Sequence, residues 1–448
     1  MMKIFMFMFS MIFLLLFKFN KKLIMYMYMY MLILLNFIFL LIFNYNDYWM
    51  NIYLNFGMDN YSMILIYLSL WILMFMMKVS FNVKNKYYYL LVLMILLIFL
   101  VLSFSCMNYF LFYMLFEISM IPTFMLIMGW GYQSERLNAG MYMFMYTMFS
   151  SLPLMMIIYY LYNLFNSLNF LLILLFNLVF MNMNQFIIYF FMFFAFFVKL
   201  PVFMFHMWLP KAHVEAPVTG SMILAGIMLK LGGYGIIRMM MMVLNFCMKF
   251  NYLIIILSLL GMFLLSLICL RQFDMKMLVA YSSVVHMALM LMSLFTLKFY
   301  GLLGGLFLMI AHGICSSGLF LMVNYLYERT KSRNIMINKG MIYLLPIFSM
   351  FFFMFCIMNM AAPPSLNLLS ELMVVLVMMD WSMNILLMLI ISMYLSASYS
   401  LYLYSSCIHG KFNNNLIKIF YNNVNNYMLM LIHLIPLNFI ILKVNMMF

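Results

Sequence analysis

Charged residues are scarce in this chain, and their scarcity decides its class. Asp, Glu, Lys and Arg make up only 7% of the 448 residues, whereas 70% are hydrophobic. A soluble domain has about 25% charged and about 45–50% apolar residues. The composition therefore excludes a soluble enzyme, a disordered chain and a secreted disulfide scaffold. Lipid must surround most of the surface, and we expect an all-α polytopic membrane protein.

Cysteine is also infrequent, and its six occurrences are far apart in the sequence. Iron–sulfur and zinc sites need clustered thiolates, and no two cysteines form a CxxC pair. The spacing argues against a metal or cluster bound by this chain and favours thiols that fill small apolar spaces. The six are Cys106, Cys247, Cys269, Cys315, Cys356 and Cys407.

Glycine (17 residues) and proline (9) are scarce as well, whereas methionine occurs 63 times. The abundant residue types have mainly AT-rich codons and the scarce ones GC-rich codons, which indicates an AT-rich genome. A genetic code that reads AUA as Met would explain the methionine excess and points to a mitochondrial genome. The alternative is a methionine-lined functional surface. The methionines are spread through nearly every segment, which favours background composition.

Long hydrophobic runs occupy most of the chain. A helix needs about 20 apolar residues to cross a bilayer. The first predicted span is short, the twelfth is long enough to be broken or sharply tilted, and the segment 168–183 could also span. The predicted spans, about 14 transmembrane helices, are 4–17, 23–43, 61–77, 87–106, 108–129, 141–163, 186–209, 216–242, 251–270, 275–297, 301–326, 341–378, 382–404 and 427–444.

The distribution of Lys and Arg decides the topology, because positive residues in short loops stay on the side from which helices insert. With fourteen spans, 16 of the 23 basic residues fall on one side, 4 on the other and 3 inside spans. Counting 168–183 as a span gives 10 on each side, so we interpret it as an interfacial or packed connecting segment. Both termini then face away from the basic side. The basic loops account for the net charge of +14 as topology determinants near lipid headgroups, and no nucleic-acid partner is expected.

Arg238 lies near the end of the predicted span 216–242, and four further charged residues lie deeper inside predicted spans, namely Glu117, Lys199, Lys230 and Glu371. Each central charge costs about 2.5–3.5 kcal/mol, which roughly 20 apolar residues outweigh. The structural alternative is two ion pairs that hold helices together. Since apolar replacements of such pairs are often neutral or stabilising, we favour a functional role. A buried Lys whose proton affinity depends on the distance to a Glu suits proton transfer.

Two histidines extend this pattern. His286 and His312 lie inside adjacent predicted spans with serine neighbours. One histidine in an apolar helix is more often a hydrogen-bonded core residue, but two of them beside buried Lys and Glu favour a proton relay. His206, His213 and Glu215 lie together at a span end. A metal site and a structural elbow both fit, but the two histidines lack the i, i+4 spacing of a helical zinc pair, which favours the elbow.

Two proline breaks predict an internal repeat. Lys199-Leu200-Pro201 interrupts the seventh span and Pro363-Pro364 the twelfth, five spans later. Proline frees backbone carbonyls, which transporters tolerate where the break lines a polar cavity. Because an odd number of helices inverts the second unit, we predict two inverted five-helix repeats, each with a broken helix beside a buried charge. The predicted domains are N-terminal helices (1–86), the first repeat (87–242), the second repeat (251–404) and a C-terminal loop and helix (405–448).

Four stretches of sequence resemble one known family. The run KLPVFMFHMWLPKAHVEAPVTGSMILAGIMLKLGGYGIIR closely resembles the central signature of chain 4 of NADH:ubiquinone oxidoreductase, respiratory complex I. The runs ICLRQFDMKMLVAYSSVVHMALM, MIAHGICSSGLFLMVNYLYERTKSR and PPSLNLLSEL are similar to it too. The resemblance extends from Asn108 to Tyr404, whereas the first hundred residues match only in hydropathy. The composition resembles that of an insect or similar invertebrate mitochondrion.

The resemblance implies a non-redox, proton-pumping subunit of the membrane arm of this enzyme, driven by remote quinone reduction. Such a subunit lies in the mitochondrial inner membrane, with basic loops towards the matrix and both termini towards the intermembrane space. It binds no cofactor itself, while the whole complex uses NADH, FMN, iron–sulfur clusters and ubiquinone. Its expected partners are other membrane-arm subunits, especially neighbouring antiporter-like subunits, and inner-membrane lipids. The alternatives are a stand-alone cation/proton antiporter of the same superfamily and a structural scaffold with inert ion pairs.

The resemblance also implies a role for each buried charge. The family has a charge pair in the first half-channel, a central proton carrier, two histidines along a hydrophilic axis and a terminal carboxylate in the second half-channel. By resemblance these are, in the same order, Glu117 with Lys199, Lys230, His286 with His312, and Glu371.

Overall fold

The computed structural model describes residues 2–16, 20–42, 49–81, 83–175, 185–411 and 424–442. Within these ranges nearly all regular structure is helical, which confirms the all-α membrane fold. Eleven helical stretches are long and apolar enough to cross a membrane, and three shorter apolar helices accompany them. Each of them coincides with one of the predicted spans, while the exact number of crossings remains a prediction.

The described residues form two compact units. The first unit contains the residues up to Lys199 together with Glu215–Cys247, and the second contains Leu200–Val214 and the residues from Met248 onwards. The helices of the first unit are α1 (Met2–Phe13), η1 (Leu14–Leu16), α2 (Lys21–Ile42), α3 (Asn60–Val79), α4 (Lys86–Ser105), α5 (Tyr109–Ile118), α6 (Met120–Trp130), α7 (Arg136–Phe165), α8 (Phe170–Leu175), α9 (Gln185–Lys199), α11 (Val218–Ile223), the π-helical turn η2 (Leu224–Met228) and α12 (Leu229–Met242).

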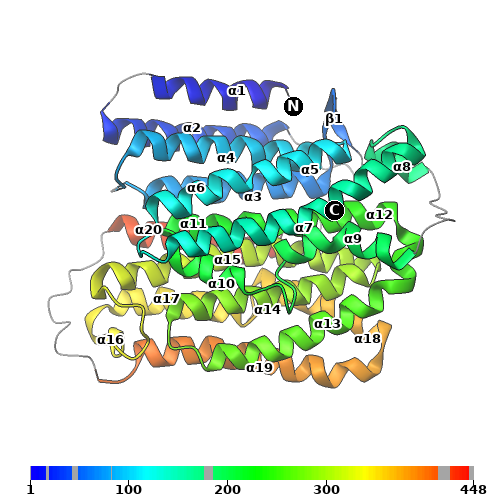
Figure 1. The fold of residues 1–448 in the computed structure, drawn as a ribbon. Helices are drawn as coiled ribbons and strands as arrows, with labels where there is room; N and C mark the ends of the chain where they lie inside the picture. Colours follow the sequence, from blue (N-terminus) through cyan, green and yellow to red (C-terminus); the bar gives the residue numbers. More distant parts are fainter. Residues whose placement is uncertain are drawn as a thin grey trace. The chain divides into compact units, whose positions relative to one another are not determined.

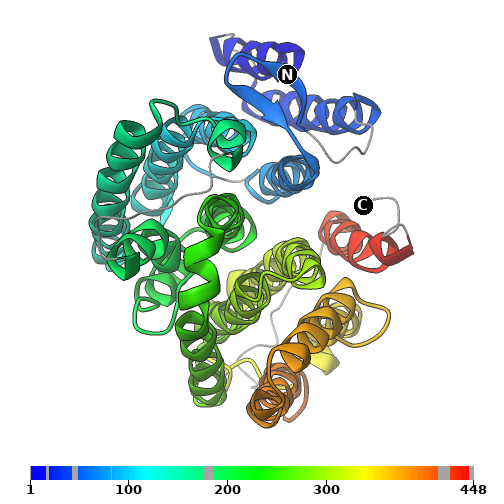
Figure 2. The ribbon, with the colours of Figure 1, turned by 90° about the vertical axis from the view of Figure 1, so that its right-hand side faces the viewer.

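The second unit is built around α14 and α15, which pack against each other and against α18. Figure 2 shows most of its helices, coloured from light green to red, nearly end-on. Its helices are α10 (Trp208–Glu215), whose last residue belongs to the first unit, α13 (Leu244–Leu270), which begins in the first unit, α14 (Met275–Phe295), α15 (Phe299–Thr330), α16 (Met341–Leu344), α17 (Pro346–Asn359), α18 (Leu366–Trp381), η3 (Met383–Ile385), α19 (Leu386–Ile408) and α20 (Val424–Phe439).

In the first unit, α7 and α12 pack along α9, whose last residue is Lys199 (Figure 1). The helix ends there because Pro201 has no N–H to donate and disfavours helical backbone at Leu200. Regular helix resumes only at Trp208, the first residue of α10. The predicted break in the seventh span is therefore confirmed, and it leaves Lys199 at a free helix end.

The twelfth predicted span is also broken, as its length and its two prolines indicated. Helix α17 ends at Asn359 and α18 begins at Leu366. Ser365 caps α18 by accepting a hydrogen bond from the Leu368 N–H at 3.3 Å. The Asn367 side chain donates to the Met358 carbonyl at 2.7 Å, an oxygen near the end of α17 that also accepts from the Ala361 N–H at 3.2 Å. Side chains therefore replace the hydrogen bonds that continuous helix would have made.

A small β-hairpin departs from the all-helical expectation. Strands β1 (Met50–Tyr53) and β2 (Phe56–Met58) pair antiparallel across a two-residue turn, Leu54 and Asn55. Asp59 follows directly and caps α3, because its carboxylate accepts from the Ser62 N–H at 3.0 Å while the Ser62 hydroxyl accepts from the Asp59 N–H at 2.9 Å. This reciprocal capping box fixes where the chain enters the third span.

The segment 168–183 is described only in its first part. Helix α8 has 6 residues, about 9 Å of helix, which is too short to span. Residues 176–183 lie outside the described ranges. The interfacial placement of this segment therefore remains a prediction.

Glycines allow two close helix contacts. A side-chain carbon added at Gly235 of α12 would overlap the ring of Phe196 of α9, and one added at Gly318 of α15 would overlap the ring of Phe355 of α17. By contrast, a carbon added at Gly129 of α6 meets nothing within 4 Å. Gly235 and Gly318 therefore serve close packing between helices.

We predict that Gly235→Ala and Gly318→Ala each destabilise the protein by about 1–3 kcal/mol, because a rigid ring must move to admit the new methyl group. Gly129→Ala is the matched control and should be neutral or slightly stabilising, since it replaces an unhindered helical glycine. Thermal inactivation of the assembled protein measures all three. Equal melting of the three variants would contradict the packing role of Gly235 and Gly318.

Candidate functional site

Lys199, the last residue of α9, is only 2% exposed. Its Nζ donates a hydrogen bond to the backbone carbonyl of Phe116 at 3.0 Å and lies 3.0 Å from the centroid of the Phe116 ring. Both contacts favour a charged ammonium. The structure thus holds Lys199 beside the residue that precedes Glu117 on α5.

Glu117 itself does not contact Lys199 as an ion pair. None of the ion pairs within 4.0 Å among the described residues joins the two side chains. The Lys199 charge still acts on the carboxylate, and Ser151 of α7 lies beside it. Both carboxylate oxygens are buried and accept no hydrogen bond from a described residue. Because a buried carboxylate without partners is costly, Glu117 needs either a proton or water.

Lys230 lies in a helix that is buried along its length. The stretch from Val218 to Met242 is helical throughout, and Lys230 has no exposed surface. Just before it, the π-helical turn η2 replaces the regular i→i+4 pattern, a feature that occurs frequently at functional sites. The Lys230 Nζ donates a short hydrogen bond to the Ala225 carbonyl in this turn. The π turn therefore supplies a backbone acceptor for the buried ammonium.

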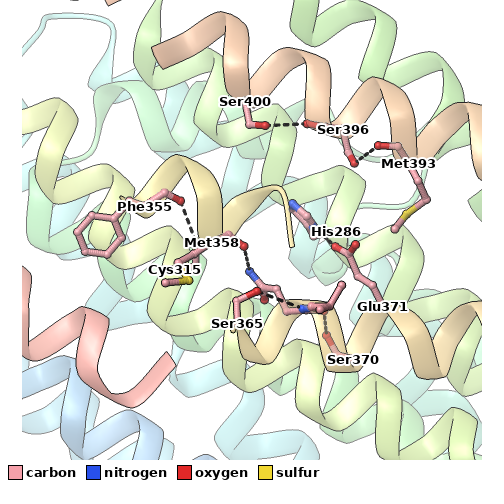
Figure 3. Close-up of polar contacts among 12 residues, drawn as sticks. His286, Cys315, Phe355, Met358, Ser365, Ser370, Glu371, Met393, Ser396 and Ser400 are labelled. Carbon is pink, nitrogen blue, oxygen red and sulfur yellow. Dashed lines mark hydrogen bonds and ion pairs between the residues drawn. The ribbon is translucent and has the colours of Figure 1, made fainter. Parts of the chain in front are cut away.

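The second unit brings three predicted residues together from three helices. His286 of α14 places its Nδ1 3.6 Å from Oε1 of Glu371 on α18, as Figure 3 shows. The ring of His312 on α15 lies 5.6 Å from the His286 ring, centroid to centroid. All three side chains are buried. An acid, a base and a second imidazole within this distance can exchange a proton directly or through one water molecule.

His206, His213 and Glu215, the residues for which a metal site was one alternative, are all buried. Their histidine rings stack on aromatic rings, His206 on Phe203 at 5.7 Å and His213 on Phe320 at 4.8 Å, in each case between centroids. In the ranges that the structure covers, no three His, Cys, Asp or Glu residues gather in a way that could hold a metal ion. The stacking rings instead favour the structural elbow.

Comparison with known proteins identifies the family. The family model for the NADH:quinone oxidoreductase/Mrp antiporter transmembrane region matches residues 106–396, and the model for the amino terminus of NADH-ubiquinone oxidoreductase chain 4 matches residues 1–103. The chain is 46% identical to NADH-ubiquinone oxidoreductase chain 4 of Ceratitis capitata, with 89% of each chain covered. It is 45% identical to the Locusta migratoria protein of that name, with 90% of each covered. The chain belongs to the NADH-ubiquinone oxidoreductase chain 4 family.

Membership of the chain 4 family confirms the resemblance stated from the sequence. The match over residues 1–103 corrects one expectation, because the first hundred residues share more than hydropathy with the family. The fold agrees as well. The solved structure of respiratory complex I from Thermus thermophilus with bound NADH contains a chain that superposes with a TM-score of 0.87 at 20% identity, over 97% of this chain and 94% of that one. The stand-alone antiporter is accordingly not favoured.

A second solved structure has the same fold in a different complex. The membrane-bound sulfane sulfur reductase, an archaeal respiratory membrane complex, contains a chain with a TM-score of 0.85 at 18% identity, over 96% of this chain and 74% of that chain. At such identities the likeness concerns the fold alone.

One buried ion pair of this chain 4 protein was not predicted from the sequence. Arg238 of α12 donates to Asp59, the cap of α3, at 2.6 Å, and both side chains are less than a tenth exposed. By sequence Arg238 lies inside the predicted span 216–242, whereas Asp59 lies just before the predicted span 61–77. A buried Arg close to the end of a span was the available signal, since such a charge needs a partner.

We predict that Asp59→Asn destabilises the protein by about 3–5 kcal/mol, because Asn can still cap α3 but leaves the Arg238 guanidinium buried without its counter-charge. The matched control is Asp380→Asn, which breaks the 3.3 Å pair with Lys298. The Asp380 side chain is 70% exposed and the Lys298 side chain 40% exposed. That change should cost at most about 1 kcal/mol. Thermal unfolding of the two variants provides the measurement. Similar losses of stability in the two variants would show that burial of the Asp59–Arg238 pair does not determine its contribution to stability.

Proposed function

We propose that this chain is a proton-translocating subunit of the membrane arm of NADH:ubiquinone oxidoreductase. The observation that carries the proposal is that each unit holds buried acid and base side chains at or beside a broken helix. Glu117, Lys199 and Lys230 lie in the first unit. His286 and Glu371, with His312, lie in the second. Charges placed inside membrane helices in this way are typical of proton paths.

In the first unit, a backbone oxygen accepts a hydrogen bond from each of the two ammonium groups. Lys199 bonds to the Phe116 carbonyl and Lys230 to the Ala225 carbonyl. A carbonyl favours the protonated amine but carries no full charge, so each lysine can lose its proton without leaving an unpaired carboxylate behind. Glu117, which has no donor among the described residues, then serves as the group that takes up or releases protons next to Lys199.

In the second unit, the group that faces the proton-carrying His286 ring is the carboxylate of Glu371. When His286 carries a proton, its ring and Glu371 attract each other across 3.6 Å, and when it is neutral this attraction is lost. A proton that moves from His312 to His286 therefore draws the imidazolium towards the Glu371 carboxylate. Transfer of that proton from His286 to Glu371 neutralises both groups, and its release from Glu371 restores the carboxylate beside a neutral imidazole. The break before α18 makes this feasible, because Glu371 lies only five positions after the first residue of a short helix.

The remaining assignments follow from membership of the chain 4 family. Quinone reduction takes place elsewhere in the complex, and this chain is proposed to bind none of its NADH, FMN, iron–sulfur clusters or ubiquinone. Its partners are proposed to be neighbouring antiporter-like subunits of the membrane arm and lipids of the mitochondrial inner membrane. The excess of positive loop residues favours an orientation with these loops towards the matrix.

The central prediction concerns Lys230. Lys230→Met keeps the length of the side chain but removes its ability to carry a proton, so proton pumping per assembled complex should fall by at least about tenfold. Lys298→Met is the control, since it makes the same change at a lysine that is 40% exposed. Native gels measure assembly, and dye-detected acidification of proteoliposomes measures pumping. Normal pumping by an assembled Lys230→Met complex would rule out the relay and favour inert ion pairs.

His286 and Glu371 should act as one unit. We predict that His286→Gln and Glu371→Gln each slow pumping and that the double variant is no slower than the worse single variant, because both changes remove the same transfer. A cycle with Ser396→Ala, a neighbouring serine of α19 whose hydroxyl bonds within its own helix at 2.6 Å (Figure 3), provides the additive control. Fully additive losses for His286 and Glu371 would contradict a shared step.

A further inference from the structure

The Arg238–Asp59 pair is part of a larger contact that joins three segments of the first unit. The Arg238 guanidinium lies 4.5 Å from the ring centroid of Trp49, just before the hairpin, and 4.7 Å from that of Tyr234, one turn earlier on α12. We name Arg238, Asp59, Trp49 and Tyr234 the Arg238 clamp. We propose that this clamp is a positioning device that sets the axial height and rotation of α12 and thereby the position of the Lys230 ammonium. The inference rests on the proposed role of Lys230 in proton transfer.

The clamp holds α12 through three contacts of the Arg238 guanidinium. The carboxylate of Asp59 accepts at 2.6 Å, while the two aromatic rings cover the guanidinium. A planar fork held in this way has one orientation, unlike a lysine ammonium, which is a point charge. Gly57 provides room for the arrangement, because a carbon added there would lie 2.9 Å from the Trp49 ring.

Asp59, which accepts the hydrogen bond from Arg238, is held in a fixed position as well. Asp59 is locked by the capping box with Ser62 at the start of α3. A residue that caps one helix and pairs with another ties the ends of both together. The contact therefore fixes α12 against the N-terminus of α3 and not merely against a mobile loop.

Helix α12 needs such an anchor because of the π turn before Lys230. Arg238 lies eight residues after Lys230, about 12 Å along the helix. On the other side of Lys230, η2 has a wider turn whose hydrogen bonds are out of step with regular helix. The hydrogen bond from Lys230 to Ala225 spans this irregular turn. Its geometry therefore depends on how α12 is held at its regular end.

Tyr234 connects the clamp to the second lysine of the same unit. Its hydroxyl donates to the Phe104 carbonyl at 2.8 Å, and its ring lies 5.8 Å from that of Phe112, centroid to centroid. Phe112 in turn lies 5.9 Å from Phe116, whose carbonyl accepts the bond from Lys199. A contiguous set of packed rings thus joins the clamp to the Lys199 site, while Lys230 lies four residues before Tyr234 on α12 itself.

Asp59 and Arg238 both stay charged near neutral pH, at which the proposed proton relay operates. Burial would raise the pKa of Asp59, but the charge and hydrogen bond of Arg238, together with Ser62, outweigh burial and hold this pKa below its ordinary value. The stabilisation is therefore fully present above the unfolded-state pKa of about 3.9 and is lost as the pH falls through the lowered value. A pair that stays charged near neutral pH is suited to hold a helix and unsuited to carry protons.

Stability alone explains the clamp poorly. Replacing a buried ion pair with neutral residues of similar volume is often neutral or stabilising, whereas fixing a structural register is the best-attested use of such a pair. These two explanations differ in what happens when both charges are removed together. A stabilising pair can then be dispensed with, and a positioning pair cannot.

The decisive variant is the double substitution Asp59→Asn with Arg238→Gln in the intact complex. It keeps a capping residue at 59 and leaves no unpaired charge, so we expect normal assembly on native gels. A displacement of about 1 Å can cost on the order of 100-fold in rate, and we expect proton pumping per assembled complex to fall by at least about tenfold, with a shifted pH optimum. Arg238→Lys, which keeps the charge but loses the planar fork, should give an intermediate loss.

The matched control is Asp380→Asn with Lys298→Gln, which neutralises the exposed pair and should change neither assembly nor pumping. Normal pumping with an unshifted pH optimum in the clamp double variant would overturn the positioning role. The Lys230→Met variant separates this outcome from failure of the proposed function. If Lys230→Met stops pumping and the clamp variant does not, only the clamp inference fails, whereas normal pumping by both removes the relay itself.

Discussion

Hydrocarbon offers no hydrogen bonds, so each polar group that this chain carries into the bilayer must find a partner within the protein. The broken helices show how the requirement is met. At the break between α17 and α18, the Asn367 amide donates to the Met358 carbonyl near the end of α17. The Lys199 ammonium, at the end of α9, donates to the Phe116 carbonyl near the end of α5. Backbone oxygens near helix ends therefore serve as acceptors for side chains that need them.

Composition and periodicity were enough to predict most of the fold. Charge scarcity gave the class, the apolar runs coincide with the helices, and Pro201 and Pro363 marked the two breaks. These features depend on local chemistry and on the solvent, which a sequence displays directly. The small hairpin before α3 was missed because its strands, of four and three residues, are too short for a sustained alternation of apolar and polar side chains. Its turn, Leu54 and Asn55, also lacks the glycine that usually marks a two-residue connection.

Only part of the candidate site could be predicted from the sequence in the same way. That Lys199, Lys230 and Glu371 are buried follows from their places in apolar runs, but their partners do not. Sequence reasoning paired Lys199 with Glu117, whereas the ammonium bonds to the carbonyl one residue earlier. The partner of Arg238 lies 179 positions away, at a helix cap that resembled an ordinary loop end. Contacts between distant segments depend on packing, and neither hydropathy nor charge counts contain that information.

The two kinds of buried charge in this chain differ in the partner that each one has. Arg238 faces a full carboxylate in a fixed geometry, so protonating Asp59 or deprotonating Arg238 would leave the other charge isolated, and the pair resists titration. Lys199 and Lys230 face carbonyl dipoles, which stabilise the charged form without requiring it. Only a charge of the second kind can appear and disappear at a cost that the protein tolerates. The choice of acceptor, more than burial itself, therefore separates the residues that hold helices in place from those suited to transfer protons.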